Sequence, residues 1–356
     1  MESSTATTVN VERVEISRID QVDFSDLTFG TIFSDHMLYV EYRNGSWQRP
    51  TIKPYGSLHL APSISALQYG VSVFEGLKAH RSTTNDALLF RPLENARRLN
   101  RSARRLAMPE VPESLFLSGL IELVRQDRAW LPPSCSGALY IRPCYFSIEN
   151  SIRVKPAEEY AFVIFTCPVG TYYNAPLEIF ATEKYTRAFP GGTGDIKPAG
   201  NYAAALIADF EAREAGFNSV MWLDAIERRY IEECGVMNIF FVMNNSVVTP
   251  SLGGTILPGV TRDSVITLLR DMNVEVVERR ISIDELAEAN SKGTLMECFG
   301  TGTAATVAHV RRIRCGEIEI TLPAIETRRV GPRVLDRLVG IMTGAEPDIH
   351  GWIERI

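Results

Sequence analysis

The sequence lacks the long apolar runs and the charge excess that mark several broad classes of protein. No stretch approaches the roughly 18 apolar residues of a membrane-spanning helix, and the first residues contain no apolar segment typical of a secretory signal. The 37 Lys and Arg residues are outnumbered by 43 Asp and Glu residues, whereas nucleic acids and acidic membranes are bound by basic faces. We therefore expect a cytoplasmic protein that binds small molecules and neither nucleic acid nor a membrane.

Paired cysteines and clustered histidines are missing as well. The six cysteines form no CxxC pair, and the five histidines show neither an HxH nor an HExxH spacing. We expect free thiols, Cys135 among them, and no bound metal. Internal repeats, low-complexity segments and a GxxxxGK[ST] phosphate loop are also absent from the sequence. Any covalent chemistry must therefore depend on another type of residue.

The 356 residues suffice for about two domains, and the first half combines hairpins with helices. The extended stretch 37–42 is followed by Asn44 and Gly45, a pair that predicts a tight hairpin turn. A helix is predicted from Pro92, where apolar residues recur at helical spacing, and a second one over 113–127.

A connector rich in Pro, Gly and Tyr separates the two halves. We predict a small N-terminal domain over 1–168, with residues 1–30 as a loose arm, a linker over 169–176 and a larger domain over 177–356. The second half mixes strands and helices, including a long helix near 203–215. Because strictly alternating βαβ units are missing, the predicted fold class is α+β.

A glycine-rich loop, GGTGDIKPAGNY at 191–202, is the strongest local anomaly. Its four glycines surround a single cation, Lys197, directly before a helix. A lysine on a rigid loop can act as a Schiff-base nucleophile, with its pKa lowered by burial and by neighbouring cations. The alternative is a surface loop with a solvated lysine, and the loop alone leaves both interpretations open.

Four further segments carry residue types that suit a charged ligand. Two have small or hydroxyl residues at a turn or helix start, which suit an anion, and one has an arginine on an apolar strand, which could clamp an anionic ligand. The fourth has paired glutamates beside an apolar strand, and one of these carboxylates could hold a proton on a ligand nitrogen. Each also has a plain structural interpretation, namely helix capping, edge charges or an internal ion pair. Together with a lysine they are the parts that a phosphorylated aldehyde cofactor needs. The segments are TILPGVTRDSV (255–265), FGTGTAAT (299–306), YIEECGVMNIFFV (230–242) and YIRP (140–143).

In this combination the chain resembles the branched-chain aminotransferases, which are class IV aminotransferases dependent on pyridoxal phosphate. The resemblance implies a two-domain pyridoxal-phosphate fold of type IV, like that of D-amino-acid aminotransferases, with a small N-terminal α/β domain and a larger C-terminal β-barrel-like domain with helices. It also implies a homodimer. The motifs follow the family's order over nearly the whole chain: YGVSVFEGLKA (69–79), FRPLENARRL (90–99), YIRP, GGTGDIKPAGNY, ERRYIEECGVMNIFFV (227–242), LPGVTR (257–262) and FGTGTAA.

The resemblance implies a role for each matching residue. Lys197 would bind the cofactor covalently and carry a proton at the substrate Cα, and Tyr202 would hydrogen-bond the cofactor's phenolic oxygen. Glu233, rather than Glu232, would face the pyridine nitrogen and keep it protonated. The implied phosphate-binding positions are Arg98, Val260, Thr261 and Thr303.

The resemblance also implies a substrate pocket. Its apolar walls would be Tyr69, Phe74 and Tyr140, with Tyr172 closing over the site, and its α-carboxylate donors would be the amides of Val236 and Ala304. Arg142 would accept the distal carboxylate of glutamate when that amino donor occupies the pocket.

The implied activity is transfer of the amino group of L-leucine, L-isoleucine or L-valine to 2-oxoglutarate, in two half-reactions. Another class IV enzyme, acting on D-amino acids, R-amines or aminodeoxychorismate, is the nearest alternative, and a non-catalytic metabolite-binding homologue is a further one. Preference among the three branched substrates stays open, because one methylene changes pocket affinity only modestly. A role in branched-chain amino acid biosynthesis or in breakdown stays open too.

Overall fold

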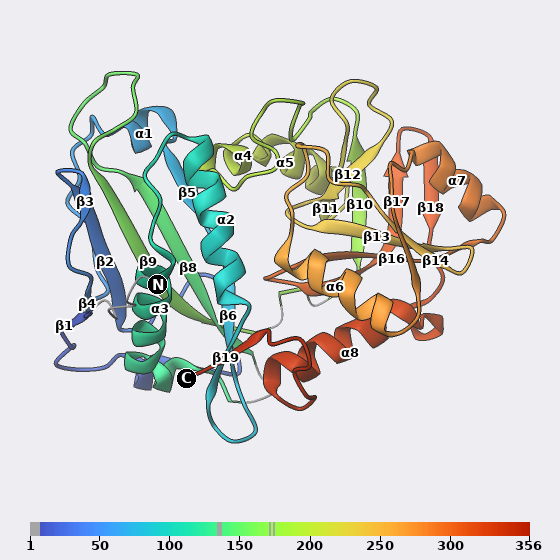
Figure 1. Cartoon of the computed structure of the whole chain (residues 1–356). Helices are drawn as coiled ribbons and strands as arrows, with labels where there is room; N and C mark the ends of the chain where they lie inside the picture. The colour runs from blue at the N-terminus through green and yellow to red at the C-terminus, as the bar shows by residue number, and fades with distance from the viewer. Residues whose placement is uncertain (1–7, 134–136, 171, 174) are drawn as a thin grey trace, which may run out of the picture. The chain divides into compact units, whose positions relative to one another are not determined.

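The computed structural model describes residues 8–133, 137–170, 172–173 and 175–356, which form two compact units (Figure 1). Cys135 lies outside the described residues. The first unit contains the chain up to Tyr172 with 197–200 and 340–356, and the second contains 173–196 and 201–339. The sequence assigned 340–356 to the second domain. These residues group with the first unit because their strand β19 (Ile353–Arg355) pairs with β7 (Ala87–Phe90).

A ten-stranded sheet forms the first unit, in the order β1-β4-β2-β9-β8-β6-β7-β19, with β3 beside β2 and β5 beside β8. Apart from parallel β1 and β4, its described strand pairs are antiparallel. The remaining strands are β1 (Asn10–Val11), β2 (His36–Arg43), β3 (Ser46–Trp47), β4 (Thr51–Pro54), β5 (Ser72–Phe74), β6 (Leu77–Arg81), β8 (Ala138–Ser147) and β9 (Tyr160–Val169).

Two helices, α2 (Pro92–Arg105) and α3 (Glu113–Gln126), bury their apolar stripes against this sheet (Figure 1). Leu99 of α2 and Phe116 of α3 share a core with Phe162 of β9, and all three are fully buried. Both helices confirm the sequence prediction. Three shorter helical turns complete the unit: η1 (Ile19–Gln21), α1 (Ser65–Tyr69) and η2 (Arg128–Trp130).

The turn between β2 and β3 follows the predicted chemistry. Asn44 and Gly45 have φ angles of 53° and 74°, the left-handed conformation that a two-residue hairpin turn requires. The hairpin predicted from the Asn-Gly pair is therefore confirmed.

A nine-stranded sheet forms the second unit, in the order β12-β11-β10-β17-β16-β13-β14-β15, with β18 beside β17. Strand β10 pairs parallel with both β11 and β17, while most other described pairs are antiparallel, and this mixture confirms the α+β class. The strands are β10 (Leu177–Thr182), β11 (Ser219–Leu223), β12 (Ile231–Cys234), β13 (Asn238–Met243), β14 (Ser246–Thr249), β15 (Glu275–Glu278), β16 (Leu295–Gly302), β17 (Thr306–Cys315) and β18 (Ile318–Thr321).

The helix predicted for the second half differs from the structure. The single helix expected near 203–215 is two helices, α4 (Ala199–Ala203) and α5 (Leu206–Glu214). The chain tightens there, because the Ala205 N–H donates to the Tyr202 carbonyl three residues back. The remaining described helices of the second half are α6 (Val260–Asp271), α7 (Ile283–Ser291), η3 (Ile325–Thr327) and α8 (Val330–Thr343).

The expectation of a loose N-terminal arm is wrong for residues 8–30. Asn10 and Val11 form β1 against β4, and the backbone N–H of Arg18 donates to the buried Asp35 at 3.0 Å. Composition pointed to a solvated segment, but long-range hydrogen bonds to buried acceptors order it.

Three general features concern only the described part of the chain. No helix there is both long and apolar enough to cross a membrane. No group of three His, Cys, Asp or Glu side chains there is placed to hold a metal ion. The five cysteines within the described ranges are free thiols: Cys144, Cys167, Cys234, Cys298 and Cys315.

Candidate functional site

Lys197 is held by its backbone on the first unit. Its N–H donates to the Ser102 hydroxyl of α2 at 3.0 Å, and its carbonyl accepts the Phe74 N–H of β5 at 3.1 Å. Its Nζ lies 4.8 Å from the centroid of the Phe74 ring. The lysine is thus half-buried and anchored at both of its peptide groups, unlike a residue of a solvated surface loop.

Glu75, between β5 and β6, is a fully buried carboxylate that orients Arg98. Arg98 donates from Nε to one carboxylate oxygen at 2.7 Å and from Nη2 to the other at 2.8 Å, and Asn95 Nδ2 adds a bond of 2.8 Å. Burial alone raises the pKa of Glu75, but the charge and hydrogen bonds of Arg98, with the charge of Lys197, bring it below its usual value. The predicted phosphate-binding arginine therefore has a buried, ionised partner in the protein.

Two aromatic rings and one cation lie in contact in the first unit. We call this group, which consists of Phe74, Tyr140 and Arg142, the aromatic wall. Tyr140 and Arg142 lie two residues apart on β8 and share a face of the sheet. Arg142 Nη2 donates to the Tyr140 hydroxyl at 2.9 Å, and its Cζ lies 4.7 Å from the Phe74 ring centroid. Glycine at position 76 permits this arrangement, since a Cβ there would stand 2.1 Å from the Tyr140 hydroxyl oxygen.

Two other predicted wall residues occupy different positions. Tyr172 packs edge-on against Phe29, with ring centroids 5.0 Å apart, and Phe29 packs in the same way against Tyr140 at 4.9 Å. Tyr69, at the end of α1, is half exposed and its hydroxyl donates to the Ile152 carbonyl at 2.7 Å. The structure thus joins Tyr172 to the aromatic wall through Phe29 and gives Tyr69 a separate partner.

Glu233 of β12 is a buried carboxylate of the second unit. One of its oxygens accepts the Leu257 N–H at 2.7 Å and lies 3.1 Å from Nη2 of the half-buried Arg187. Arg187 also donates to the carbonyls of Gly194 and Thr255. Position 194 must be glycine for this contact, since a Cβ there would stand 2.4 Å from the Thr255 oxygen. Arg187 therefore ties the glycine-rich loop to the Glu233 carboxylate.

The neighbouring Glu232 has different surroundings. One of its oxygens accepts the Thr255 hydroxyl, and the other is buried without a hydrogen-bond partner among the described residues. Burial raises the pKa of Glu232 above its usual value, opposed by the Thr255 hydrogen bond and the charge of Arg187. Two adjacent carboxyl groups thus differ, because Glu233 has a cation in direct contact and Glu232 does not.

Asn238, the first residue of β13, joins the start of α6 to the sheet of the second unit. Its Nδ2 donates to the Leu257 carbonyl at 2.9 Å, and a Cβ on Gly259 would stand 2.1 Å from its Oδ1. Helix α6 begins directly after Gly259, which has no side chain with which to cap the first turn. The amides of Val260 and Thr261 therefore start a helix at a closely packed corner, a geometry suited to an anion.

The turn between β16 and β17 lies beside the turn between β12 and β13. A Cβ on Gly302 would stand 3.2 Å from Met237 Cγ and 3.8 Å from the Val236 carbonyl oxygen. Thr303 and Ala304 follow Gly302 in this turn and are half-buried, while Val236 is half exposed. Since Asn238 also pairs with Thr301 of β16, this residue of the segment 230–242 connects it to both predicted anion-binding turns, 255–265 and 299–306.

The predicted site residues therefore fall into two sets. Lys197, Phe74, Tyr140 and Arg142 come together in the first unit, as do Arg98 and its partner Glu75. The second unit holds Glu233, the three turns joined by Asn238, and Tyr202, which is half-buried on α4. The first set is Tyr69, Phe74, Arg98, Tyr140, Arg142, Tyr172 and Lys197, and the second is Tyr202, Glu233, Val236, Val260, Thr261, Thr303 and Ala304.

Sequence reasoning missed the residues that hold the site residues in place. Glu75 left one signal, a carboxylate within the apolar stretch VFEGL, and Asn238 left another, an amide opening a wholly apolar strand. Arg187 and Phe29 left none, since each is recognised only by contacts with residues far away in the chain.

Comparison with known proteins gives concordant matches. The model of the family described as amino-transferase class IV matches residues 72–313. A protein named probable branched-chain-amino-acid aminotransferase, from Staphylococcus aureus (strain N315), is 44% identical over 349 residues, which cover 97% of each chain.

Solved structures with a similar fold have the same name as this relative. The Escherichia coli branched-chain amino acid aminotransferase is 27% identical with a TM-score of 0.73, covering 90% of this chain and 98% of that one. A second branched-chain amino acid aminotransferase, from the organism abbreviated T.th., is complexed with N-(5'-phosphopyridoxyl)-L-glutamate. It is 27% identical with a TM-score of 0.68, covering 88% of this chain and 97% of that one. Both similarities extend over nearly the full length of the chain.

Proposed function

Because this chain belongs to the class IV aminotransferases, in the branched-chain-amino-acid aminotransferase family, we propose that it moves the amino group of L-leucine, L-isoleucine or L-valine to 2-oxoglutarate. The products are the branched 2-oxo acid and L-glutamate, formed in two half-reactions in which both substrates use one pocket. The observation that carries this proposal is the aromatic wall, which offers apolar surface and a single cation beside Lys197.

The residues present suit pyridoxal 5'-phosphate as the cofactor. Lys197 is anchored at both peptide groups, the start of α6 offers amides at a first turn that follows the glycine Gly259, and Glu233 is a buried carboxylate with a cation and an amide in contact. These are partners for an aldehyde, a phosphate and a protonated ring nitrogen respectively. The T.th. enzyme was solved with N-(5'-phosphopyridoxyl)-L-glutamate, which is consistent with this assignment.

When bound, this cofactor supplies an electron sink for the bond broken at the substrate Cα. Lys197 would hold the aldehyde carbon and move the proton at Cα. Glu233 would keep the ring nitrogen protonated, a role for which a carboxylate paired with Arg187 is better suited than Glu232. Tyr202 would hydrogen-bond the phenolic oxygen.

The phosphate would be bound by residues of several segments. Arg98 offers a guanidinium whose orientation is set by Glu75, and the start of α6 offers amides. The proposed phosphate ligands are Arg98, the amides of Val260 and Thr261, and the Thr303 hydroxyl.

Substrate recognition would use the aromatic wall in two ways. Phe74 and Tyr140 would contact a branched side chain, whereas Arg142 would pair with the distal carboxylate of glutamate or 2-oxoglutarate. The amides of Val236 and Ala304 would bind the α-carboxylate. Cytoplasmic location and assembly as a homodimer belong to the same proposal.

The dual use of the wall is tested by Arg142→Met, measured in each half-reaction separately. The KM for 2-oxoglutarate should rise about 10- to 100-fold, since a charge-assisted contact is lost, while the KM for L-leucine changes less than about threefold. Lys197→Ala should abolish both the visible absorbance of bound cofactor and turnover. A parallel rise of both KM values in Arg142→Met would contradict the proposed role of this residue.

A further inference from the structure

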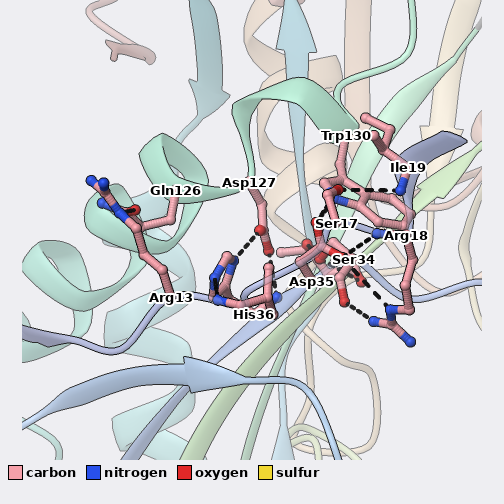
Figure 2. A network of polar contacts seen from close by, with 12 residues as sticks. Arg13, Ser17, Arg18, Ile19, Ser34, Asp35, His36, Gln126, Asp127 and Trp130 are labelled. Atoms are coloured by element: carbon pink, nitrogen blue, oxygen red, sulfur yellow. Dashed lines mark hydrogen bonds and ion pairs between the residues drawn. The ribbon is translucent and has the colours of Figure 1, made fainter.

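A polar network built around two buried carboxylates, called here the neck network, joins the N-terminal arm to the body of the first unit. Figure 2 shows most of its members, which are Val14, Ser17, Arg18, Ser34, Asp35, His36, Asp127 and Trp130. Asp35 and Asp127 are among the most buried carboxylates of the unit, 5% and 1% exposed. Neither belongs to the site described above.

Asp35 is the centre of one half of the neck network. Its carboxylate accepts the Ser17 hydroxyl at 2.5 Å, the Arg18 N–H at 3.0 Å and the Trp130 indole N–H at 2.8 Å. Arg18 in turn donates from Nη2 to the Ser34 carbonyl at 2.7 Å. The arm and the start of β2 are thereby held side by side.

His36 is the centre of the other half, and its protonation state follows from its partners. The backbone N–H of Val14 lies 3.1 Å from Nε2, and a backbone amide can only donate, so Nε2 carries the lone pair. The ring proton is therefore on Nδ1, which donates to Asp127 at 2.6 Å. His36 thus links the arm to Asp127 as a neutral imidazole.

These contacts close the ends of residues 20–33 into an Ω-like loop, called here the arm loop. Its middle carries Phe29, which packs on Tyr140 and Tyr172, and its end carries Phe33, which stacks on Tyr55 with centroids 4.9 Å apart. Phe29 and Phe33 pack against the small apolar cluster that contains Tyr140. The neck network thus stands at the base of a loop whose far side supports the aromatic wall.

We propose that the neck network is a positioning device for substrate side-chain recognition: it holds the arm loop closed, so that Phe29 keeps Tyr140 in place. Tyr140 is already limited on two other sides, by its bond to Arg142 and by the close approach of Gly76. Phe29 supplies a third support, through its T-shaped contact with the Tyr140 ring. This inference rests on the proposed function, because it takes Tyr140 to contact the substrate.

A matched pair of variants tests the inference on the holoenzyme. In His36→Asn the side-chain amide can occupy the Nδ1 position and still donate to Asp127, but it offers no acceptor to Val14. In His36→Gln the longer side chain can place its carbonyl oxygen at the Nε2 position and accept from Val14. Arg13→Ala is the control, because Arg13 donates to the side chain of Gln126 on the exposed surface and belongs to the arm outside the neck network.

The readouts are KM and kcat for L-leucine and L-alanine, with limited proteolysis in the arm loop. We expect His36→Asn to raise the KM for L-leucine about 3- to 10-fold, as loss of one hydrogen bond allows, with kcat and the KM for L-alanine within about twofold. His36→Gln should recover most of the leucine KM, and Arg13→Ala should leave it unchanged. Faster cleavage in the arm loop should accompany the leucine effect.

Two results would overturn the inference: cleavage that accelerates in His36→Asn without any change in the leucine KM, or equal KM increases for leucine and alanine. If both His36 variants fail to fold, Ser17→Ala is the substitute, because it removes one of the three hydrogen-bond donors to Asp35. It should raise the KM for L-leucine selectively, by less than His36→Asn would. An unchanged KM for L-leucine would count against the inference. Absence of L-leucine turnover in the unsubstituted protein is a different failure, which overturns the proposed function, and with it the substrate role claimed for the arm loop.

Discussion

Replacing Glu75 or Arg98 should reveal whether Arg98 serves structure alone or also binds the cofactor phosphate. Glu75→Gln exchanges one carboxylate oxygen for an amide that faces the donors of Arg98 and Asn95, and it leaves a guanidinium only 7% exposed without its counter-charge. Breaking a buried ion pair on one side costs about 3–5 kcal/mol, so the first unit should lose that much unfolding free energy. Arg98→Met should cost a similar amount, because it leaves the fully buried Glu75 carboxylate without its cation.

The double variant Glu75→Gln/Arg98→Met separates the two roles. Removing both charges together is often close to neutral, so its stability should lie within about 1–2 kcal/mol of the original protein. Cofactor affinity should behave differently, since loss of one charge-assisted contact to phosphate weakens binding roughly 10- to 150-fold. The double variant should therefore regain stability and remain a poor cofactor binder.

The assay is chemical unfolding of the cofactor-free protein, followed separately for the two units because one two-state transition is not assured. Trp130, buried in the first unit, and Trp222, buried in the second, are natural fluorescence probes for this purpose. A cost below about 1 kcal/mol for Glu75→Gln, or a double variant as unstable as the sum of its parts, would refute the reasoning about the buried pair. Normal cofactor affinity in the double variant would refute the phosphate role of Arg98.

Three further predictions concern the same residues and the second unit. Gly259→Ala should weaken cofactor binding about tenfold or more, because its Cβ would displace the Asn238 amide. Gly253→Ala is the control and should leave cofactor binding unchanged, since the space around that position is open. Titration with pyridoxal phosphate measures the cofactor affinity of both variants. Arg187→Met should lower the unfolding free energy of the second unit by about 3–5 kcal/mol, since it removes the cation beside the buried Glu233, and Arg187→Lys should cost less in the same unfolding experiment. The pKa of Glu75 in the folded protein lies below its usual value of 4.5, because the ion pair with Arg98 outweighs the effect of burial. The stabilisation by this carboxylate is therefore complete above pH 4.5 and is lost as the pH falls through the lower pKa of the folded state. Unfolding measured across this acidic range should show the difference in stability between the original protein and Glu75→Gln becoming smaller.

The sequence was informative about local structure wherever the signal lies in a short segment. The Asn-Gly pair identified the hairpin after β2, and Pro258-Gly259 identified the start of α6, because each signal is local backbone chemistry. The glycine-rich loop singled out Lys197, whose role in catalysis stays a prediction. The family assignment followed from the order of such segments.

The contacts that hold the candidate site residues in place could not be predicted from short sequence segments. Arg187 and Glu233 meet through contacts between distant segments, and the ion pair of Glu75 with Arg98 joins a strand end to a helix. The arm up to residue 30 was misjudged for the same reason, since its polar composition hides bonds to the buried Asp35 and His36. The composition of a segment indicates only its average environment. It does not reveal hydrogen bonds to a few specific residues far away in the chain.

The central claim is most directly tested by comparing transamination rates for L-leucine, D-alanine and an R-amine, each with 2-oxoglutarate and added pyridoxal phosphate. The arrangement of Phe74, Tyr140 and Arg142 predicts the highest kcat/KM for L-leucine. L-leucine as the slowest of the three would contradict it.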